Sequence, residues 1–359
     1  MKIDCSDCHV TYDIPEEFLP QREKIAFNCK KCGCKIAFAH PLFENHVSSR
    51  KPAGDHASGV QRQSAQETVT HDPAGVRAFK SKVRMCLMGS IPPVAQIVAK
   101  AQMVVANPFA GLRDLAEVIE KDAGITTRAL KIANSAYYGL SGKVTSIGHA
   151  SVLLGNKILG EIITMAGVRG FLGEKLKGYG LDSGDLWRHS LAVAVSSKLL
   201  ATKRSPGYAE DAFVGGLLHD AGMIMLDPYI LEKKEFFEEI MGDGLHTSLD
   251  AERTVFGTDH TEVGAEILGE WGIPSALLKP VAKHHHPSAS SGPLTQIVHV
   301  GDILAKRFGL GLGQDDMLYD TDRNAMEFLG MQEGDLELLR SEVCDSVDSI
   351  TMDVLQETP

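Results

Sequence analysis

The side chains best suited to chemistry in this sequence are histidines and aspartates in its second half. His219 and Asp220 are adjacent and directly follow the apolar run 213–218. Another His-Asp pair, at 71 and 72, shows that the dipeptide alone carries little information. The pair at 219 and 220 is distinguished by its company of further histidines and one more aspartate, all in segments with helical patterning. These are His189, His260, His284, His285 and Asp302.

Imidazole nitrogens and carboxylate oxygens bind one or two divalent cations when helices bring them together. A mixed shell of this kind suits Fe, Mn, Ni, Zn or Mg, and the bound cation can polarise a phosphate ester. We therefore treat these seven residues as a candidate divalent-metal site, with His219 and Asp220 as candidate catalytic residues. An alternative has equal weight on spacing alone. Histidines at helix ends often hydrogen-bond to backbone carbonyls and bind no metal.

Cysteines near the N-terminus define a second candidate metal site. Cys5 and Cys8 form one C-x2-C pair, Cys29 and Cys32 form another, and twenty residues separate the pairs. This spacing lets four thiolates converge on one zinc ion, which supplies the folding energy that a short segment lacks. Four protein ligands close the coordination sphere, so the predicted zinc is structural. The alternatives are a redox pair or unpaired thiols, and Cys34 is a spare cysteine that can replace Cys32.

Helices are the elements that must position the histidines. From about residue 75, apolar residues recur three and four positions apart, with prolines at the breaks. The alternating pattern of strands is almost absent outside the cysteine-rich segment. The sequence therefore predicts a mainly α protein, an all-helical bundle preceded by a small β zinc ribbon. The expected helical segments are 94–105, 112–119, 125–133, 185–200, 209–226, 231–241, 261–271 and 276–283.

The chain divides by composition into four parts. The second part is rich in Ser, Pro, Gly, Gln and His and has few large apolar residues, which is typical of a linker. The third part is expected to contain two subdomains, about 75–180 and 181–308. In order, the parts are the zinc ribbon (1–40), the flexible linker (41–74), the helical domain (75–308) and an acidic tail (309–359).

The acidic tail is predicted to end in an amphipathic helix. Its apolar residues are spaced three and four apart and form a single stripe. We expect the stripe to pack on its own domain, and the alternative is a face for a dimer or another partner. The stripe consists of Leu336, Leu339, Val343, Val347, Ile350 and Val354.

The charge distribution excludes some classes of partner. The formal net charge is −11, and residues 315–359 hold thirteen acidic residues against two arginines. Because no basic stripe is present, the sequence argues against binding to nucleic acid or to an anionic membrane. The first residues lack the apolar segment of a secretory signal, and charged residues interrupt the most apolar stretch, 151–172. We therefore predict a cytoplasmic protein, in which the cysteines stay reduced.

The order and context of these motifs resemble the HD superfamily of metal-dependent phosphohydrolases, and more closely the HDOD domain of bacterial signalling proteins. The likeness extends over about residues 85–308, while residues 3–38 resemble short zinc-ribbon modules at the N-termini of many bacterial proteins. The HDOD-like segments are IPP at 91–93, IANSAYYG at 132–139, SI at 146–147 before LLG at 153–155, LWRHS at 186–190, GLLHD at 216–220 and DHTEVG at 259–264.

The resemblance also assigns roles to residues. It implies that the superfamily's metal ligands are His189, His219, Asp220 and Asp302, and that His260, His284 and His285 match positions used in two-metal members. Active members usually have a lysine after the glycine that corresponds to Gly222, whereas this chain has Met223, whose side chain cannot stabilise negative charge. Arg188 and Lys283 are candidates to replace that lysine. The Gly-Tyr-Pro segment of the cyclic-di-GMP phosphodiesterase branch is also missing, since SASSG follows at 288–292.

Two functions follow from the resemblance. HDOD domains are regarded mainly as signalling modules without established catalysis, so the leading prediction is a regulatory or scaffolding signal-transduction protein. Its HDOD domain would sense or relay a signal through a nucleotide ligand or through contacts with signalling proteins. The alternative is a divalent-metal-dependent phosphohydrolase or cyclic-nucleotide phosphodiesterase. A nucleic-acid binder acting through the ribbon is the weakest hypothesis, because the ribbon has no net positive charge.

Overall fold

The structure is a computed structural model of the chain. It describes residues 73–355 except 89–92, 121, 141, 243–245, 313–318 and 320, together with four short strands nearer the N-terminus.

The four strands form two antiparallel pairs. β1 (Lys2–Asp4) pairs with β2 (Thr11–Asp13), and β3 (Lys24–Asn28) pairs with β4 (Lys35–Ala39). The predicted zinc ligands Cys5, Cys8, Cys29 and Cys32 lie outside the described residues, as does most of the segment 41–74. The zinc ribbon and the linker therefore stay predictions.

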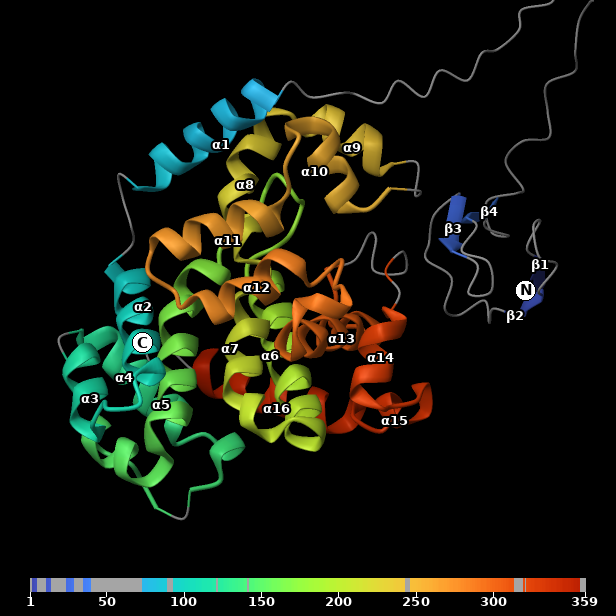
Figure 1. Ribbon diagram of the computed structural model, residues 1–359. Coiled ribbons are helices and arrows are strands. Elements are labelled where there is room, and N and C mark those ends of the chain that lie inside the picture. Colours follow the sequence, from blue (N-terminus) through green and yellow to red (C-terminus); the bar gives the residue numbers. More distant parts are fainter. Residues whose placement is uncertain are drawn as a thin grey trace, which may run out of the picture.

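The rest of the described chain is helical, which confirms the mainly α fold expected from the sequence (Figure 1). The first helices are α1 (Pro73–Met88), α2 (Pro93–Ala106), α3 (Leu112–Ile119), α4 (Ala123–Ala133), the short 3-10 helix η3 (Ala136–Tyr138) and α5 (Ile147–Leu172). The next are α6 (Asp185–Arg204), α7 (Ala209–Leu218), α8 (Ala221–Glu232), α9 (Lys234–Met241), α10 (Ser248–Phe256), α11 (His260–Glu270), α12 (Ser275–Lys283) and α13 (Pro293–Arg307). The last are α14 (Arg323–Leu329), α15 (Glu333–Glu337) and α16 (Arg340–Leu355).

One segment that was predicted as a single helix forms two helices in the structure. The expected segment 209–226 breaks between α7 and α8, so that His219 ends the first helix and Asp220 precedes the second. The apolar pattern continues through the break because both helices are buried over nearly their whole length. A pattern of burial therefore cannot reveal this break, although the break is what directs the two side chains into the protein.

The helix α5 organises the N-terminal half of the helical domain. It packs against α2, α3 and α4 (Figure 1). Gly155 interrupts it with φ 77 and ψ 168, a backbone conformation that favours glycine. By length and composition α5 could cross a membrane, but 61% of its apolar window is buried within the protein, so its apolar residues serve the core.

The C-terminal half is built around α6. This helix packs along α7 and α13, while α11 packs against α8 and α12. Gly222 permits the contact between α8 and α11, because a Cβ at this position would collide with the carbonyl oxygen of His260. α1 covers α8 and α11, where Phe79 stacks on Phe256 and Lys80 pairs with Glu262.

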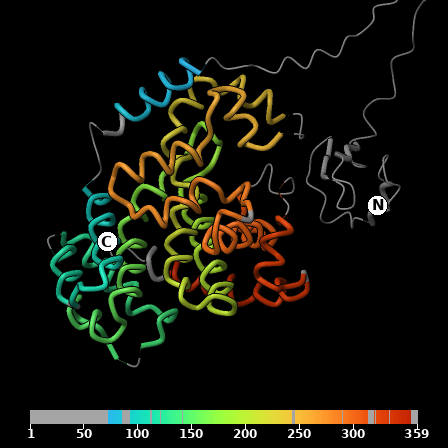
Figure 2. Tube along the Cα trace, in the orientation of Figure 1, coloured from blue at the N-terminus to red at the C-terminus, as the bar shows by residue number. Residues whose placement is uncertain are grey.

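The acidic tail docks on the domain through its apolar stripe. α16 contacts α6, α4 and η3, and Leu339 and Val347 are 2% and 0% exposed. Figure 2 shows the tail running back across the molecule to end near α4. The expected packing of the stripe on its own domain is confirmed for its described side chains, and the tail bridges the two halves.

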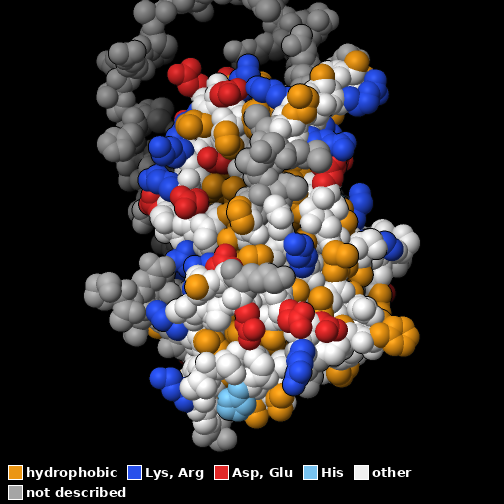
Figure 3. Space-filling view, turned by 90° about the vertical axis from the view of Figure 1, so that its left-hand side faces the viewer, with side chains coloured by type: hydrophobic (Ala, Val, Ile, Leu, Met, Phe, Trp, Pro, Cys, Tyr) orange, Lys and Arg blue, Asp and Glu red, His pale blue; other side chains and the backbone are white. Residues whose placement is uncertain are grey.

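The face formed by α1, α2 and α3 carries mixed side chains. Figure 3 shows basic, acidic and hydrophobic groups interspersed over it.

Candidate metal centre

The predicted site residues come from six different places in the helical domain and lie close together. Asp220 lies in the break between α7 and α8, and histidines from four helices surround its carboxylate. The other ligands come from separate elements: His189 from α6, His219 from the end of α7, His260 from the start of α11, His284 and His285 from the end of α12, and Asp302 from α13. All seven candidate residues therefore meet in one place.

Backbone carbonyls fix the orientation of three of these histidines. The Nδ1 atom of His189 lies 2.8 Å from the carbonyl of Leu310. The Nδ1 atom of His219 lies 2.7 Å from the carbonyl of Gly216. The Nδ1 atom of His284 lies 3.0 Å from the carbonyl of Val281. A carbonyl only accepts, so each Nδ1 carries the proton in the neutral ring and each Nε2 keeps a lone pair for a metal.

The first group of ligand atoms surrounds one oxygen of Asp220. Its Oδ2 atom lies 3.0 Å from His219 Nε2 and 3.5 Å from His189 Nε2. Asp302 Oδ1 lies 3.3 Å from His189 Nε2 and 3.9 Å from His219 Nε2. Both imidazoles thus lie between the two carboxylates.

The second group surrounds the other oxygen of Asp220. Its Oδ1 atom lies 3.3 Å from His260 Nε2 and 3.3 Å from His284 Nε2. His285 Nε2 lies 3.1 Å from His260 Nε2. Asp220 therefore belongs to both groups. Ligand atoms of Asp220, His260, His284 and His285 lie within 4.8 Å of one another, as do those of His189, His219 and Asp220, and those of His219, His284 and Asp302. These overlapping groups would suit one or two divalent cations, with Asp220 as a ligand in either case.

Several atoms of this cluster are buried without a hydrogen-bond partner. Buried polar atoms are normally paired, and each exception calls for an explanation. Here the exceptions point at one another from different elements, and a bound cation would satisfy them together. They are Nε2 of His189, His219 and His284, Nδ1 of His285, and Oδ1 of Asp220 and Asp302. The residues present fit a divalent metal.

A nearby histidine, His299, has the purely structural role that was the alternative to metal binding. His299 Nδ1 donates to the carbonyl of His284 at 2.6 Å, and His299 Nε2 accepts from the backbone N–H of Asp322 at 2.8 Å. Both ring nitrogens of His299 are thereby used by the backbone. His189, His219 and His284 use one nitrogen in this way and direct the other into the cluster.

The electrostatics of the cluster are those of a site that exchanges protons for metal. Burial by itself lowers the pKa of His189, but the contacts with Asp220 and Asp302 raise it to about 9. Burial likewise opposes the charged form of Asp220, yet the surrounding histidines hold its pKa well below its usual value. Asp220 therefore stays ionised. A cation would displace the additional proton that His189 otherwise carries.

Glu252 is a member of the site that sequence reasoning missed. Its carboxylate is fully buried and accepts from the backbone N–H of His260 at 2.6 Å and faces His260 Nδ1 at 2.8 Å. The hydroxyl of Tyr179 donates to it at 2.9 Å. Although burial lowers the pKa of His260, Glu252 and Asp220 raise it well above its usual value. A glutamate inside α10 has no pattern that distinguishes it from a surface glutamate, so no signal in the sequence identifies it.

The two basic residues proposed to replace the missing lysine lie elsewhere. Arg188 pairs with Asp348 at 3.1 Å on the surface, and Lys283 is exposed. Met223 does line the cavity beside the ligands, as expected from its position after Gly222. The lysine that reaches the cluster is Lys306, whose Nζ lies 2.7 Å from Asp302 Oδ2. Its spacing of four from Asp302 on a helix was a usable signal, because such residues lie on the same face.

With this geometry established, the chain can be classified. The described residues form a helical domain in which His and Asp side chains cluster. The sequence profile of the HDOD domain matches residues 91–287, so the chain belongs to the HDOD family.

The chain is similar to several known proteins at low identity. An uncharacterised protein of Treponema pallidum (strain Nichols) is 22% identical over 197 residues, which cover 55% of this chain and 38% of that protein. Among solved structures, an HDOD domain protein of unknown function from Geobacter sulfurreducens has a TM-score of 0.63 and 23% identity, covering 78% of this chain and 98% of that one. A candidate phosphohydrolase from Shewanella amazonensis SB2B has a TM-score of 0.60 and 21% identity, covering 76% and 98%. At these identities the structures support the fold alone.

Proposed function

We propose that this protein is a cytoplasmic signal-transduction module whose HDOD domain binds divalent metal through the seven clustered residues. The bound metal and its ligand would set which signalling partners the protein contacts. The observation that carries this proposal is the convergence of buried ligand atoms that have no hydrogen-bond partner. Regulatory use agrees with Met223, which leaves the expected lysine position without a charge.

We further propose that Cys5, Cys8, Cys29 and Cys32 hold a structural zinc in an N-terminal ribbon, joined to the HDOD domain by a linker. In support, the residues between β1 and β2 include the first cysteine pair, and those between β3 and β4 include the second. Zinc-binding pairs are expected in the connections of such hairpins. This zinc would stabilise the ribbon without taking part in chemistry.

Metal analysis of the full-length chain, purified without chelator, tests both sites. We expect one zinc from the ribbon and one or two further divalent ions from the helical centre. Cys5→Ser should remove one zinc and leave the other metal in place, while Asp220→Asn should do the reverse. Wild-type protein that contains only the ribbon zinc, even after incubation with Mn²⁺, Fe²⁺ and Zn²⁺, would contradict the metal-binding HDOD domain.

A second candidate function is a metal-dependent phosphohydrolase. It is favoured by the two groups of ligands that share Asp220, since paired cations stabilise both the attacking and the leaving oxygen in phosphate-ester cleavage. The test is release of p-nitrophenol from mono- and bis(p-nitrophenyl) phosphate by metal-loaded protein. Robust cleavage that Asp220→Ala abolishes would favour this function over the regulatory one. Rates equal in wild type and variant would reject it.

A further inference from the structure

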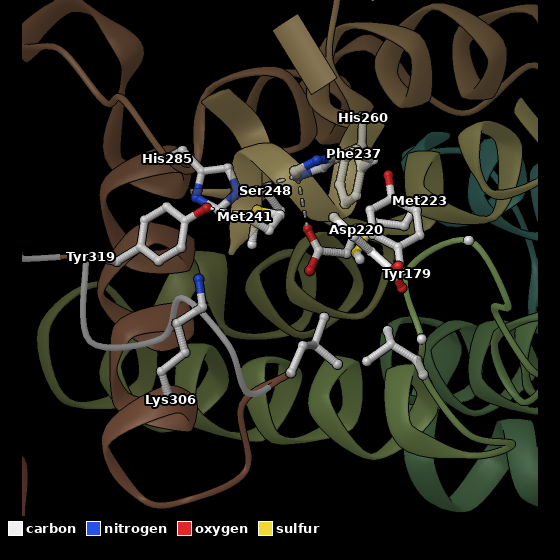
Figure 4. Close-up of a pocket in the computed structure, with 15 residues that line it drawn as sticks. Tyr179, Asp220, Met223, Phe237, Met241, Ser248, His260, His285, Lys306 and Tyr319 are labelled. Atoms are coloured by element: carbon white, nitrogen blue, oxygen red, sulfur yellow. Dashed lines mark hydrogen bonds and ion pairs between the residues drawn. The ribbon is translucent and has the colours of Figure 1, made fainter. Parts of the chain in front are cut away.

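Lys306 places a positive charge against the metal centre from one side. It lies one helical turn after Asp302 on α13, its side chain is 7% exposed, and its Nζ is 2.7 Å from Asp302 Oδ2. Tyr319 holds the ammonium group from the other side, with its ring centroid 3.9 Å from Nζ. The same ring stacks on His285 at 4.7 Å with an interplanar angle of 19°. Lys306, Tyr319 and His285 thus form one wall (Figure 4).

This wall borders a cavity that reaches the metal ligands. Asp220, His260 and His285 line the cavity at the centre, and Lys306 lies at its edge. The remaining walls are largely apolar and aromatic. They include Tyr179, Met223, Phe237, Met241 and Tyr319 (Figure 4). The cavity therefore offers two environments, a charged one beside the metal centre and a flat apolar one next to it.

The balance of charge in this cavity depends on the metal. Asp302 directs Oδ2 to Lys306 and Oδ1 into the metal cluster. A cation held by Oδ1 would draw the negative charge of Asp302 toward itself, and so away from the ammonium group of Lys306. Two neighbouring positive charges in a buried site attract an anion strongly, because little water is present to screen them. Lysine binds phosphate as a point charge at sites of this kind.

We infer that Lys306 is the anion-binding residue of the metal-site cavity, and that its ligand is a phosphate group attached to a flat, apolar organic body. This inference rests on the proposed function, because it takes the metal-loaded centre as given. Lys306 supplies the positive group from α13. In the active relatives that the sequence resembles, the corresponding lysine follows the glycine at the position of Gly222. Tyr319 acts as a positioning residue, since it fixes the ammonium group against Asp302.

Calorimetric titration of Mn²⁺-loaded, full-length protein tests the inference. The probes are inorganic phosphate and two phosphonates, methylphosphonate and phenylphosphonate, whose C–P bond resists hydrolysis. We expect all three to bind, with phenylphosphonate the tightest because its ring meets the aromatic walls. Lys306→Met should weaken every probe by about 10–100-fold, the effect of losing a charged hydrogen-bond partner. Lys306→Arg should retain most of the affinity, and Lys283→Met, an exposed lysine next to His284, should match wild type.

Metal content measured on the same samples separates this inference from the proposed function. Equal anion binding by wild type and Lys306→Met, at equal metal content, overturns the role of Lys306. Wild-type protein that holds metal in the centre but binds none of the probes also overturns it and leaves the metal centre standing. Equal affinity for methylphosphonate and phenylphosphonate overturns the flat apolar body alone. A centre that takes up no metal and no anion overturns both proposals.

Discussion

Two of the buried clusters in the described part of the helical domain differ in how completely their charged and metal-ligating groups are paired. In the first, Glu161 on α5 is fully buried and both its oxygens accept from Lys198 Nζ, at 2.6 and 2.7 Å. The rings of Tyr137, Tyr138 and Phe213 surround the ammonium group at 5.8, 5.9 and 5.6 Å. In the second cluster, the His and Asp centre, six buried nitrogen and oxygen atoms have no partner.

This difference in pairing separates buried charges that stabilise the fold from buried groups that are available to a ligand. Glu161 and Lys198 join α5 to α6, and therefore the N-terminal half of the domain to the C-terminal half, with each charge compensated by its partner. The His and Asp centre is also held rigidly, but its rigid contacts use only the outward atoms of the rings. Its inward atoms have no hydrogen-bond partner, and a bound cation would join them. Unpaired atoms that converge, rather than burial or charge alone, distinguish the ligand site.

The largest effect should follow from removing the residue that both ligand groups share. Asp220→Asn loses an anionic ligand from each group, so metal affinity should fall by more than the roughly 10–100-fold that outer-shell changes cause. Metal content by mass spectrometry after dialysis measures this loss. The matched control is Asp227→Asn on the same helix, a carboxylate that accepts from the backbone N–H of Gly178 at 2.7 Å. Loss of metal in the control as well would mean that α8 had unfolded.

Breaking the paired cluster should instead affect stability. Lys198→Met leaves the Glu161 carboxylate buried without its partner, which costs about 3–5 kcal/mol of unfolding free energy. Urea unfolding followed by circular dichroism measures the change. The double variant Lys198→Met with Glu161→Gln should recover much of the loss, because no unpaired charge remains. Metal content should stay at the wild-type value in both variants, and a parallel loss of metal would erase the proposed distinction between the clusters.

The comparison also explains what could be predicted from the sequence. The helices and the seven site residues were accessible because periodicity marks buried helix faces and because the motifs resemble those of a known family. The arrangement of these residues into two groups around Asp220 could not be predicted from the sequence. Asp220 lies between two groups because the predicted helix 209–226 breaks beside it, and a pattern of uniform burial hides that break.

Residues that act through three-dimensional contacts were the ones missed. Glu252 supports His260 from eight residues away, across the turn between α10 and α11. Lys306 follows Asp302 by one helical turn but lies outside the motifs that resemble those of the family. Arg188 and Lys283 are near the ligands in the sequence, but their side chains lie at the surface. Proximity along the chain was a poor guide to proximity in the cavity.

The paired cluster predicts a pH dependence of stability. Burial raises the pKa of Glu161 from 4.5 to about 7, although Lys198 opposes the shift. The folded protein therefore binds a proton more tightly than the unfolded chain does. The stability from this group is fully present below about pH 4.5 and is lost as the pH rises toward 7, by at most about 3 kcal/mol.

The variant Glu161→Gln isolates this contribution. Its unfolding free energy, measured against that of wild type from pH 4.5 to 7.5, should show a difference that grows in favour of the variant as the pH rises. The histidines of the metal centre titrate equally in both proteins and cancel from the difference. A constant difference over this range would show that Glu161 stays ionised in the folded state.

The smallest effect is expected at Glu252, which supports a ligand without contacting the metal. Glu252→Gln removes the negative charge behind His260, so metal affinity should fall by about 10–100-fold. The control is Glu262→Gln, a more exposed glutamate on α11 that pairs with Lys80 at 2.7 Å. Its metal affinity should equal that of wild type.

The pH dependence of this loss identifies how Glu252 acts. Glu252 raises the pKa of His260, so its removal weakens the binding of both the metal and the proton that competes with it. Competition from the proton is weaker at pH 9 than at pH 6, so more of the loss of metal affinity should be measured at pH 9. At pH 6 the proton competes less in the variant than in wild type, so the measured loss should be smaller. Competition titrations with a fluorescent chelator at the two pH values give both affinities. A loss of equal size at pH 6 and pH 9 would mean that Glu252 only holds the His260 ring in place, and that its charge does not strengthen the ligand.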